Sequence, residues 1–265
     1  MSTTSPPPDG TQPPTSADPD LPSPFRWEGW HIGAPLAGGR VLFTTRRGGV
    51  SEGPFAELNL SRSVEDEGAR VDVNRERLAA QVGVDWLDFS HGRQVHGTRV
   101  RRVLPGAPRR VRGAEEDGQA TAEEDNPALV LVADCLPVTL AGESSVAALH
   151  AGWRGLAGGI LEEGIAALRD CGETGPLAAA LGPSARPCCY EVGDEVHAHF
   201  PEPGARVGER GLDLAAVARQ RLVAGGVDDI HDVGLCTMCH PQLFFSHRRD
   251  AGRTGRQAGL VWRAG

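Results

Sequence analysis

Three short, largely apolar segments follow one another in the middle of the chain and dominate what it can fold into. They are residues 129–133, 138–141 and 146–149, with the sequences LVLVA, VTLA and VAAL. Uninterrupted apolar runs of this length, bounded by turn residues, are typical of strands that are buried on both faces. The segments therefore predict neighbouring strands inside a sheet that other elements cover.

Metal-binding side chains lie at the ends of these segments. Cys135 precedes the second segment and His150 follows the third. Between them, Gly142 and Glu143 fit the centre of a two-residue type II′ hairpin turn. Such a hairpin would place Cys135 directly opposite His150, with Cβ atoms about 5 Å apart on one side of the sheet. The pair would suit two ligands of one ion, or a thiol–imidazole couple.

His96, in the string QVHG at residues 94–97, supplies a third metal-binding side chain. A Cys and two His are a sufficient ligand set for a catalytic zinc, which keeps its fourth position open for water or substrate. Zinc lowers the pKa of bound water towards about 7. We therefore predict that His96, Cys135 and His150 are the metal ligands and catalytic residues, although only the tertiary fold can bring them together.

The composition excludes several classes of partner and chemistry. The net charge is −8, and all 27 basic residues are arginines that form no basic run, which argues against nucleic acid or an anionic membrane as the main partner. The absence of lysine excludes Schiff-base catalysis by a lysine. No apolar stretch approaches the roughly 18 residues of a membrane span, and no secretion signal is seen. We expect a cytoplasmic protein whose six cysteines are thiols or ligands.

The first 24 residues differ from the rest. They contain eight prolines and almost no large apolar side chains, which is typical of a disordered tail. Residues 25–265 show no further linker and no repeat, which predicts one catalytic domain. Further strands are predicted at 41–45, 98–100, 178–181, 230–235, 243–245 and 259–262, and helices at 70–82, 156–169, 191–199 and 212–224. The predicted fold is a single α/β (α+β) domain with a mixed β-sheet flanked by helices.

Ten short strings, in order along the chain, resemble one known family. They are TTRRGGVS at 44–51, LNL at 58–60, QVHG at 94–97, ADCLP at 133–137, LHAGWRG at 149–155, GPS at 182–184, CCYEVG at 188–193, CT at 236–237, FFSHRRD at 244–250 and TGRQ at 254–257. Together they resemble the laccase-domain, or multicopper polyphenol oxidase-like, family. The resemblance covers about residues 40 to 262.

The resemblance implies a zinc-dependent purine nucleoside enzyme. It implies phosphorolysis of adenosine, inosine, guanosine and methylthioadenosine, hydrolytic deamination of adenosine, and in some members the correction of wrongly built peptidoglycan precursors. It also implies small-molecule nucleosides and phosphate as partners, a monomer, and His96, Cys135 and His150 as the metal triad.

Other polar residues of the matched strings are candidates for substrate binding and proton transfer. Asp134 is predicted to orient a ligand or relay a proton, although it would equally suit the end of a strand. Arg46, in a Gly-rich turn, and Arg154, at the start of a helix, are predicted to hold phosphate, because arginine binds oxyanions with a bidentate fork. Asn59 and Gln94 are the remaining predicted substrate-binding residues.

Three alternatives concern the chemistry of the cysteines. A true copper oxidase would need more histidines than the nine present, although copper can occupy a His-Cys-His site as an adventitious ion. Without a metal, Cys135 would be a nucleophile with His150 as its base, in an amidohydrolase acting on a cell-wall precursor. A second zinc at Cys236 and Cys239 is disfavoured, since the adjacent cysteines at 188–189 would point in different directions on an extended chain.

Overall fold

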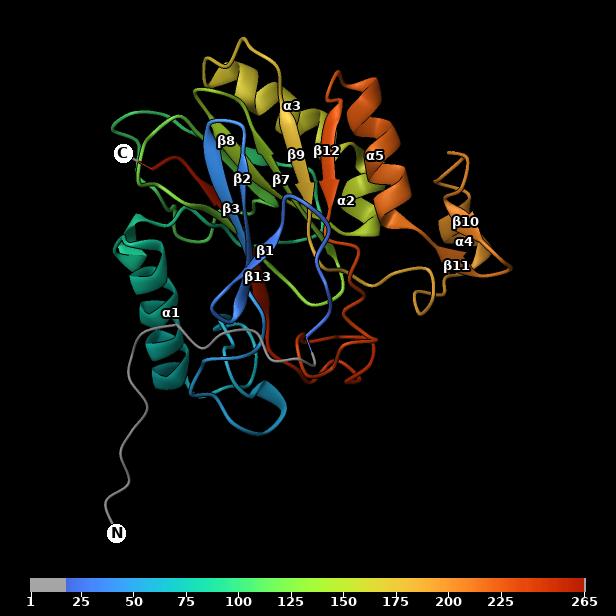
Figure 1. Ribbon diagram of the computed structural model, residues 1–265, viewed down its shortest axis with the longest axis horizontal. Coiled ribbons are helices and arrows are strands. Elements are labelled where there is room, and N and C mark those ends of the chain that lie inside the picture. Colours follow the sequence, from blue (N-terminus) through green and yellow to red (C-terminus); the bar gives the residue numbers. More distant parts are fainter. Residues whose placement is uncertain (1–17, 265) are drawn as a thin grey trace.

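The computed structural model describes residues 18–264, which form two β-sheets packed face to face (Figure 1). The five-stranded sheet is antiparallel, in the order β1 (Arg26–Glu28), β2 (His31–Leu36), β3 (Gly39–Phe43), β13 (Gln257–Trp262), β6 (Ala128–Val132). The six-stranded sheet is mixed, in the order β12 (Asp229–Asp232), β9 (Ala178–Leu181), β7 (Leu136–Ala141), β8 (Val146–Ala151), β5 (Gly118–Thr121), β4 (Val100–Val103).

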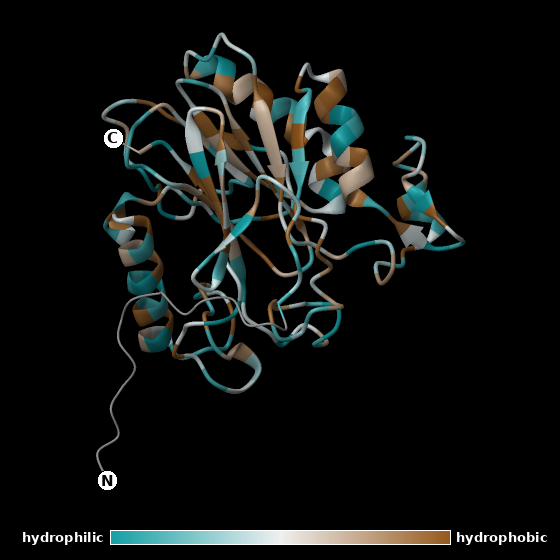
Figure 2. Cartoon of the chain, viewed as in Figure 1, coloured by the Kyte–Doolittle hydropathy of each residue, from teal (hydrophilic) through white to brown (hydrophobic). Residues whose placement is uncertain are grey.

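Helices cover the outer faces of both sheets. The helices are α1 (Gly68–Val82), α2 (Trp153–Gly158), α3 (Ile160–Asp170), α4 (Asp194–His197) and α5 (Leu214–Ala224), with short 3₁₀ turns η1 (Gly53–Phe55) and η2 (Trp86–Asp88). Helices α2, α3 and α5 lie against the six-stranded sheet, and α1 packs on the five-stranded one. Figure 2 shows both apolar and polar residues along α5, whose buried residues include Leu214, Val217 and Leu222. A small hairpin, β10 (Arg206–Val207) and β11 (Gly211–Leu212), lies beside α4.

Small side chains allow the two sheets to approach closely. The core between them combines Val41, Val130 and Val261 of one sheet with Ala148 and Ala180 of the other. One close approach is at a glycine of β13, position 259, where an added Cβ would come within 2.6 Å of a proline Cβ on β7. Large residues at these positions would force the sheets apart, because close-packed cores do not accommodate extra volume cheaply.

The predicted single α/β domain is confirmed, with two sheets where one was expected. The three central segments form β6, β7 and β8, and β6 and β7 belong to different sheets. Strands β1, β2 and β5 were missed, since the sequence of β5 (GQAT) lacks the apolar residues that mark a strand. The strand predicted at 243–245 is wrong. The N–H groups of Leu243 and Phe244 both donate to the His240 carbonyl, which makes this segment a turn.

The β7–β8 hairpin differs from the predicted two-residue turn. Residues 142–145 form a four-residue loop, and the carboxylate of Glu173, just beyond α3, accepts hydrogen bonds from a loop serine and stabilises it. In this register His150 faces Pro137, two residues beyond Cys135. The predicted direct pairing of Cys135 with His150 is therefore wrong, although a shift of two residues preserves the side of the sheet on which a side chain lies.

The boundary of the predicted tail also changes. Of the predicted tail 1–24, residues 1–17 lie outside the described residues, whereas residues 18–24 pack on the domain. The carboxylate of Asp18 forms an ion pair with the Arg47 guanidinium at 2.8 Å, and its side chain is only 2% exposed. The domain therefore begins at or before Asp18, because a buried carboxylate paired with an arginine is a fixed tertiary contact.

Deletion of residues 1–24 is expected to lower the free energy of unfolding by about 2–3 kcal/mol, in addition to any loss of activity. The deletion removes the ion pair just described, the packing of Leu21 on the core, and the hydrogen bond from Trp27 Nε1 to the Pro19 carbonyl (3.2 Å). Deletion of residues 1–17 alone keeps these contacts and serves as the control. Equal denaturation midpoints for the two truncated chains would show that the segment contributes no stability.

Over residues 18–264, no helix is both long enough and apolar enough to cross a membrane.

Candidate metal centre

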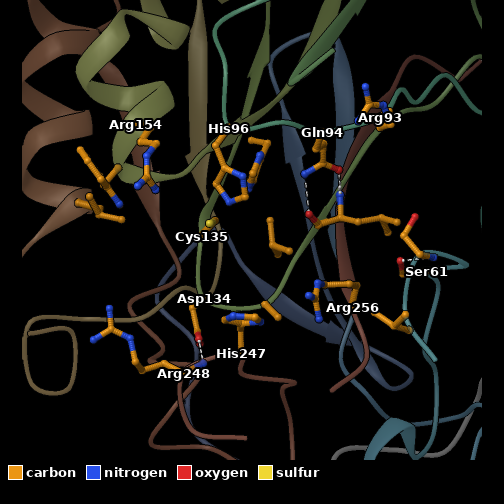
Figure 3. Close-up of a pocket in the computed structure, with 18 of the residues that line it drawn as sticks. Ser61, Arg93, Gln94, His96, Asp134, Cys135, Arg154, His247, Arg248 and Arg256 are labelled. Atoms are coloured by element: carbon orange, nitrogen blue, oxygen red, sulfur yellow. Dashed lines mark hydrogen bonds between the residues drawn. The ribbon is translucent and has the colours of Figure 1, made fainter. Parts of the chain in front are cut away.

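Three segments bring His96, Cys135 and His150 together at one end of the two-sheet core (Figure 3). His96 lies in the loop before β4, Cys135 immediately precedes β7, and His150 is the fifth residue of β8. Their potential ligand atoms all lie within 4.8 Å of one another. The two imidazole rings meet edge to face with centroids 4.8 Å apart. The predicted triad is thus one cluster, of the size that a single ion requires.

Asp117 fixes two of the three side chains and was not predicted from the sequence. Its carboxylate accepts hydrogen bonds from the backbone N–H groups of Val95 (3.1 Å), His96 (2.9 Å) and Gly97 (2.8 Å). It also contacts His150 Nδ1 at 2.8 Å. His96 has a φ of 61°, a conformation that costs a non-glycine residue energy and persists only where neighbours impose it. The buried carboxylate provides that constraint.

The contact with Asp117 also determines which nitrogen of His150 faces the cluster. Because Nδ1 is engaged by the carboxylate, Nε2 is left to act as a ligand. In protein metal sites, a histidine ligand usually donates its second ring N–H to a carboxylate, a backbone carbonyl or water. The sequence signal for Asp117 was weak, since it lies far along the chain from both histidines and precedes a strand without apolar residues.

The titration behaviour of Cys135 and His150 favours a thiolate. Burial alone would raise the pKa of the Cys135 thiol, but the adjacent His150 charge and hydrogen bonds from both imidazoles lower it to about 6. Burial would likewise lower the pKa of His150, but Cys135 and Asp117 raise it to about 9. Cys135 is therefore a thiolate at neutral pH, which is the form that binds metals and attacks electrophiles.

A glycine lets the start of α2 approach the cluster. A Cβ added to Gly152 would lie 3.0 Å from the Cys135 sulfur and 3.1 Å from His96 Cδ2. Gly152 comes directly before α2, in the string LHAGWRG. A larger residue would push into the space between the two ligands, which explains why a small residue is needed there.

Asp134 lies beside the cluster without contacting a ligand. Its carboxylate accepts hydrogen bonds from Thr237 Oγ1 (2.6 Å) and from the backbone N–H of Arg248 (2.7 Å). It has a φ of 91° and is 8% exposed, at the point where the chain crosses from β6 to β7. The predicted role of orienting a ligand is therefore not supported. Asp134 connects the β6–β7 link to the loops that contain Thr237 and Arg248.

The cluster opens into a cavity of about 550 Å³. Apolar and aromatic side chains, among them Leu131, Val132, Trp153 and Tyr190, form part of its wall. Its polar lining comprises Ser61, Ser63, Arg93, Gln94, Asp134, Arg154, His247, Arg248 and Arg256. A cavity that combines an apolar and aromatic wall with converging polar groups suits a small organic molecule that carries polar substituents.

Three arginines face this cavity without a carboxylate partner. Within the described residues, Arg154, Arg248 and Arg256 form no ion pair; Arg154 stacks on the Trp153 ring at 4.3 Å, and the other two donate to backbone carbonyl oxygens. Arg93, at the rim, pairs with Glu115 instead. Uncompensated guanidinium groups around a cavity favour an oxyanion, which they bind with charge-assisted hydrogen bonds.

Arg46, predicted to bind phosphate, lies elsewhere. Its guanidinium donates to the carbonyl oxygens of Ala56 (2.6 Å) and Pro241 (3.0 Å) and stacks on the Phe245 ring at 4.6 Å. It borders a separate surface depression, with Trp30 among its neighbours. The prediction for Arg46 is corrected: this side chain does not line the cavity, and two of its nitrogens join loops through backbone carbonyls.

Asn59 and Gln94 also have structural contacts where substrate binding was predicted. Asn59 is fully buried and accepts a hydrogen bond from the Arg256 backbone N–H (2.9 Å), so it supports the cavity from outside. Gln94 lines the cavity, but its amide pairs with both the N–H and the carbonyl of Leu131. Its main effect is to attach the His96 loop to β6.

The chain was also compared with known protein families and proteins. Residues 40–264 match the model of the multi-copper polyphenol oxidoreductase laccase family. The chain belongs to that family. A purine nucleoside phosphorylase of Xylella fastidiosa is 44% identical, over 86% of this chain and 94% of that protein. Purine nucleoside phosphorylase YlmD of Geobacillus stearothermophilus is 36% identical, over 92% and 98%.

Solved structures in this family have the same fold. The crystal structure of YlmD from Geobacillus stearothermophilus has a TM-score of 0.84 at 33% identity, over 92% of this chain and all of that one. The Neisseria meningitidis protein NMB0706 has a TM-score of 0.79 at 36% identity, over 89% and 100%. The resemblance seen in the ten short strings is confirmed.

The residues present fit one metal ion better than the copper centres in the family description. A cysteine thiolate and two imidazoles, one backed by Asp117, are a suitable donor set for a single borderline ion such as zinc. A multicopper oxidase also needs a cluster of many histidines. In the part of the chain that the structure describes, only one cluster of potential ligands contains histidine, and it has two.

Proposed function

We propose that this protein is a metal-dependent purine nucleoside phosphorylase, with zinc held by His96, Cys135 and His150. The observation that carries the proposal is the position of the ligand cluster in a cavity that also has three arginines without carboxylate partners. Phosphorolysis needs this combination, because it joins an anionic nucleophile to a largely apolar purine nucleoside. The names of the relatives support the same activity.

The described side chains can each be given a task. Arg154, Arg248 and Arg256 would hold phosphate against C1′ of the ribose, and Trp153 and Tyr190 would cover the purine. A metal bound at the cluster would act as a Lewis acid towards a substrate oxygen or nitrogen. In the phosphorolytic step a phosphate oxygen bonds to C1′ as the glycosidic bond breaks, and the purine leaves with the bonding electrons. The apolar wall excludes water, which would otherwise compete with phosphate.

We further propose adenosine, inosine, guanosine and methylthioadenosine as substrates, with hydrolytic deamination of adenosine at the same centre. The apolar lining, including Leu131 and Val132, offers no polar group that would reject a methylthio substituent. Deamination requires a Lewis-acidic centre beside the purine ring, which the ligand cluster would provide.

A turnover screen on nucleosides, with and without phosphate, tests the proposal on protein of measured zinc content. Release of free purine base only when phosphate is present is the expected result, and inosine formed from adenosine would add the deaminase activity. Release of purine base at the same rate with and without phosphate would contradict phosphorolysis. No turnover of any nucleoside by zinc-loaded protein would contradict the whole proposal.

Replacement of Arg256 by Gln is expected to raise the KM for phosphate about 10- to 100-fold, because each charge-assisted hydrogen bond contributes about 1.5–3 kcal/mol. Nucleoside binding should change less. Arg46→Gln is the matched control, since its guanidinium lies outside the cavity. If Arg46→Gln raised the KM for phosphate more than Arg256→Gln did, Arg46 would be the phosphate-binding residue, as the sequence predicted.

One observation favours a second candidate function. The Cys135 sulfur lies within 4.8 Å of a ring nitrogen of His150, whose Nδ1 contacts Asp117, and this is also the arrangement of a cysteine nucleophile with its general base. We retain a metal-free amidohydrolase acting on a cell-wall precursor as the alternative. His96 separates the two proposals, because a nucleophilic dyad has no need for a second imidazole next to the thiolate.

A further inference from the structure

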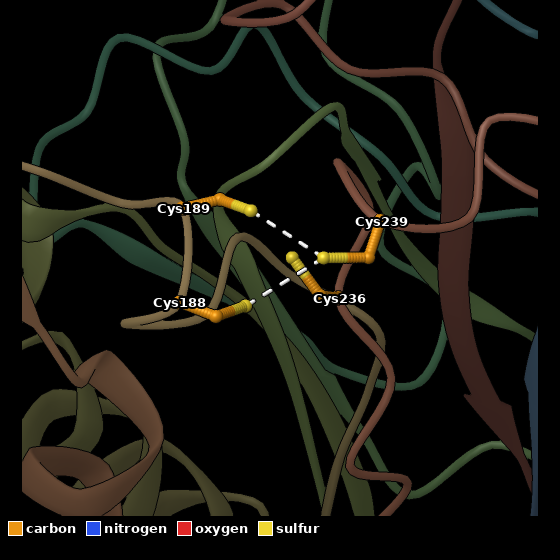
Figure 4. Close-up of side chains that lie close together, drawn as sticks. All are labelled: Cys188, Cys189, Cys236 and Cys239. Atoms are coloured by element: carbon orange, nitrogen blue, oxygen red, sulfur yellow. Dashed lines mark hydrogen bonds between the residues drawn. The ribbon is translucent and has the colours of Figure 1, made fainter.

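A second cluster of sulfur atoms lies outside the cavity. Cys188, Cys189, Cys236 and Cys239 come from two segments about fifty residues apart, and their four sulfur atoms lie within 4.8 Å of one another (Figure 4). The Cys239 sulfur is 3.7 Å from that of Cys188 and 3.4 Å from that of Cys189. All four are free thiols, and none of them takes part in the nucleoside site described above.

The local backbone explains how adjacent cysteines reach one point. Residues 187–189 form a turn, closed by hydrogen bonds from the N–H groups of Cys189 (2.9 Å) and Tyr190 (2.8 Å) to the Arg186 carbonyl. Side chains of neighbouring residues point to opposite sides only on an extended chain. A second metal site was disfavoured from sequence because an extended chain was assumed at Cys188 and Cys189, whereas the structure has a turn there.

The second segment has the form of a metal-binding turn. Cys236 and Cys239 are spaced as Cys-x-x-Cys, and residues 237–239 form a turn. A Cys-x-x-Cys spacing is the arrangement by which many structural zinc sites hold two of their four ligands.

We propose that these four cysteines bind a zinc ion as a structural tetrathiolate site. A zinc ion about 2.3 Å from four tetrahedrally arranged sulfurs separates them by about 3.8 Å. The two measured separations are close to that value, whereas a disulfide requires about 2.0 Å. Four protein ligands fill the coordination shell, so this ion would be structural, in contrast to the open three-ligand centre in the cavity. Cys188 and Cys239 are exposed, which gives the ion a path of entry.

The proposed site would tie together two loops that support the cavity. Tyr190, in the cavity wall, directly follows Cys189, and Thr237, which donates to Asp134, directly follows Cys236. A backbone bridge between Ser184 and Cys236 and an ion pair between Arg186 and Asp232 already join these two segments near the cluster. A metal cross-link would hold them in register, as structural zinc does in other proteins that lack a local core.

The test is the zinc content of the full chain, measured by elemental analysis after dialysis against a weak chelator. The expected content is two zinc ions per chain in the wild type. Cys188→Ser/Cys239→Ser should lose one equivalent, show a melting temperature several degrees lower, and keep the cavity zinc. Cys171→Ser, which alters a cysteine outside both clusters, is the matched control and should keep two. Cys135→Ser should lose only the cavity equivalent, so failure of the cavity site and failure of the tetrathiolate site give different results.

Cobalt substitution provides a second readout that does not depend on catalysis. The sulfur-to-cobalt charge-transfer band grows with the number of thiolates, so most of its intensity should persist in Cys135→Ser and disappear in Cys188→Ser/Cys239→Ser. The single variant Cys239→Ser keeps three ligands and should release zinc to a chelator at least about tenfold faster. Unchanged zinc content in the double variant, or a disulfide among the four cysteines in zinc-loaded protein, would overturn the proposal.

Discussion

Cys135→Ser is expected to lose zinc from the cavity and to lower nucleoside turnover by more than about 100-fold. Mutation of a residue that only hydrogen-bonds to a metal ligand already lowers metal affinity or activity by about 10- to 100-fold. The serine hydroxyl stays protonated at neutral pH and binds zinc poorly, whereas Cys135 is held as a thiolate beside His150. The fold should survive because the two side chains are nearly isosteric. Zinc content, turnover and melting temperature, measured on the same preparation, check the result.

His96→Ala is the variant that separates the two candidate mechanisms. With a three-ligand metal centre, it should lose zinc and turnover in parallel with Cys135→Ser. A metal-free cysteine nucleophile would need Cys135 and His150 but not His96. If His96→Ala retained most of its activity while Cys135→Ser was inactive, the phosphorylase with a metal triad would be wrong and the amidohydrolase would be favoured.

Asp117→Asn is expected to have the second-largest effect, on both stability and metal binding. One carboxylate oxygen accepts from His96 N–H and contacts His150 Nδ1, and the other accepts from Val95 and Gly97. An amide would replace one acceptor with a donor facing other donors. The expected losses are about 2–4 kcal/mol in the free energy of unfolding and about 10- to 100-fold in zinc affinity.

Glu116→Gln is the matched control for Asp117→Asn. Glu116 is also buried, and its carboxylate pairs with Arg101 at 2.8 Å, away from the ligand cluster. Its neutralisation should lower stability but leave zinc affinity unchanged. If both variants lost zinc to the same extent, the effect of Asp117 would be general destabilisation and not the positioning of the two histidines.

Part of this site could be predicted because its signals are local. His96, Cys135 and His150 stand beside small residues or at the ends of apolar segments, and the donor chemistry of Cys and His is independent of the fold. Arg154 was singled out for the same reason, since it lies in the string that begins α2, and the structure places it in the cavity wall. The alternation of apolar segments likewise predicted β6, β7 and β8, because strands buried on both faces have a composition that no exposed element shares.

Other features depended on distances that the sequence does not contain. Asp117 contacts residues 21 and 33 positions away, and no local pattern marks a carboxylate that accepts hydrogen bonds from a distant loop. Arg46 and Arg154 both follow a strand in a glycine-containing string, so the sequence favours them equally as phosphate-binding residues. In the structure, Arg46 stacks on Phe245 outside the cavity, whereas Arg154 lines the cavity. The separation of β6 and β7 into different sheets also required the complete hydrogen-bond pattern.

The sequence by itself therefore determined the fold class, the membership of one family, and the presence of two histidines and a cysteine that are able to bind a metal. The tertiary structure decided which groups meet. It placed three arginines without carboxylate partners around His96, Cys135 and His150, removed Arg46 and Asn59 from the cavity, and gathered four cysteines at two turns. The physical reason is that residue types fix what a group can bind, whereas backbone turns and sheet packing fix its neighbours.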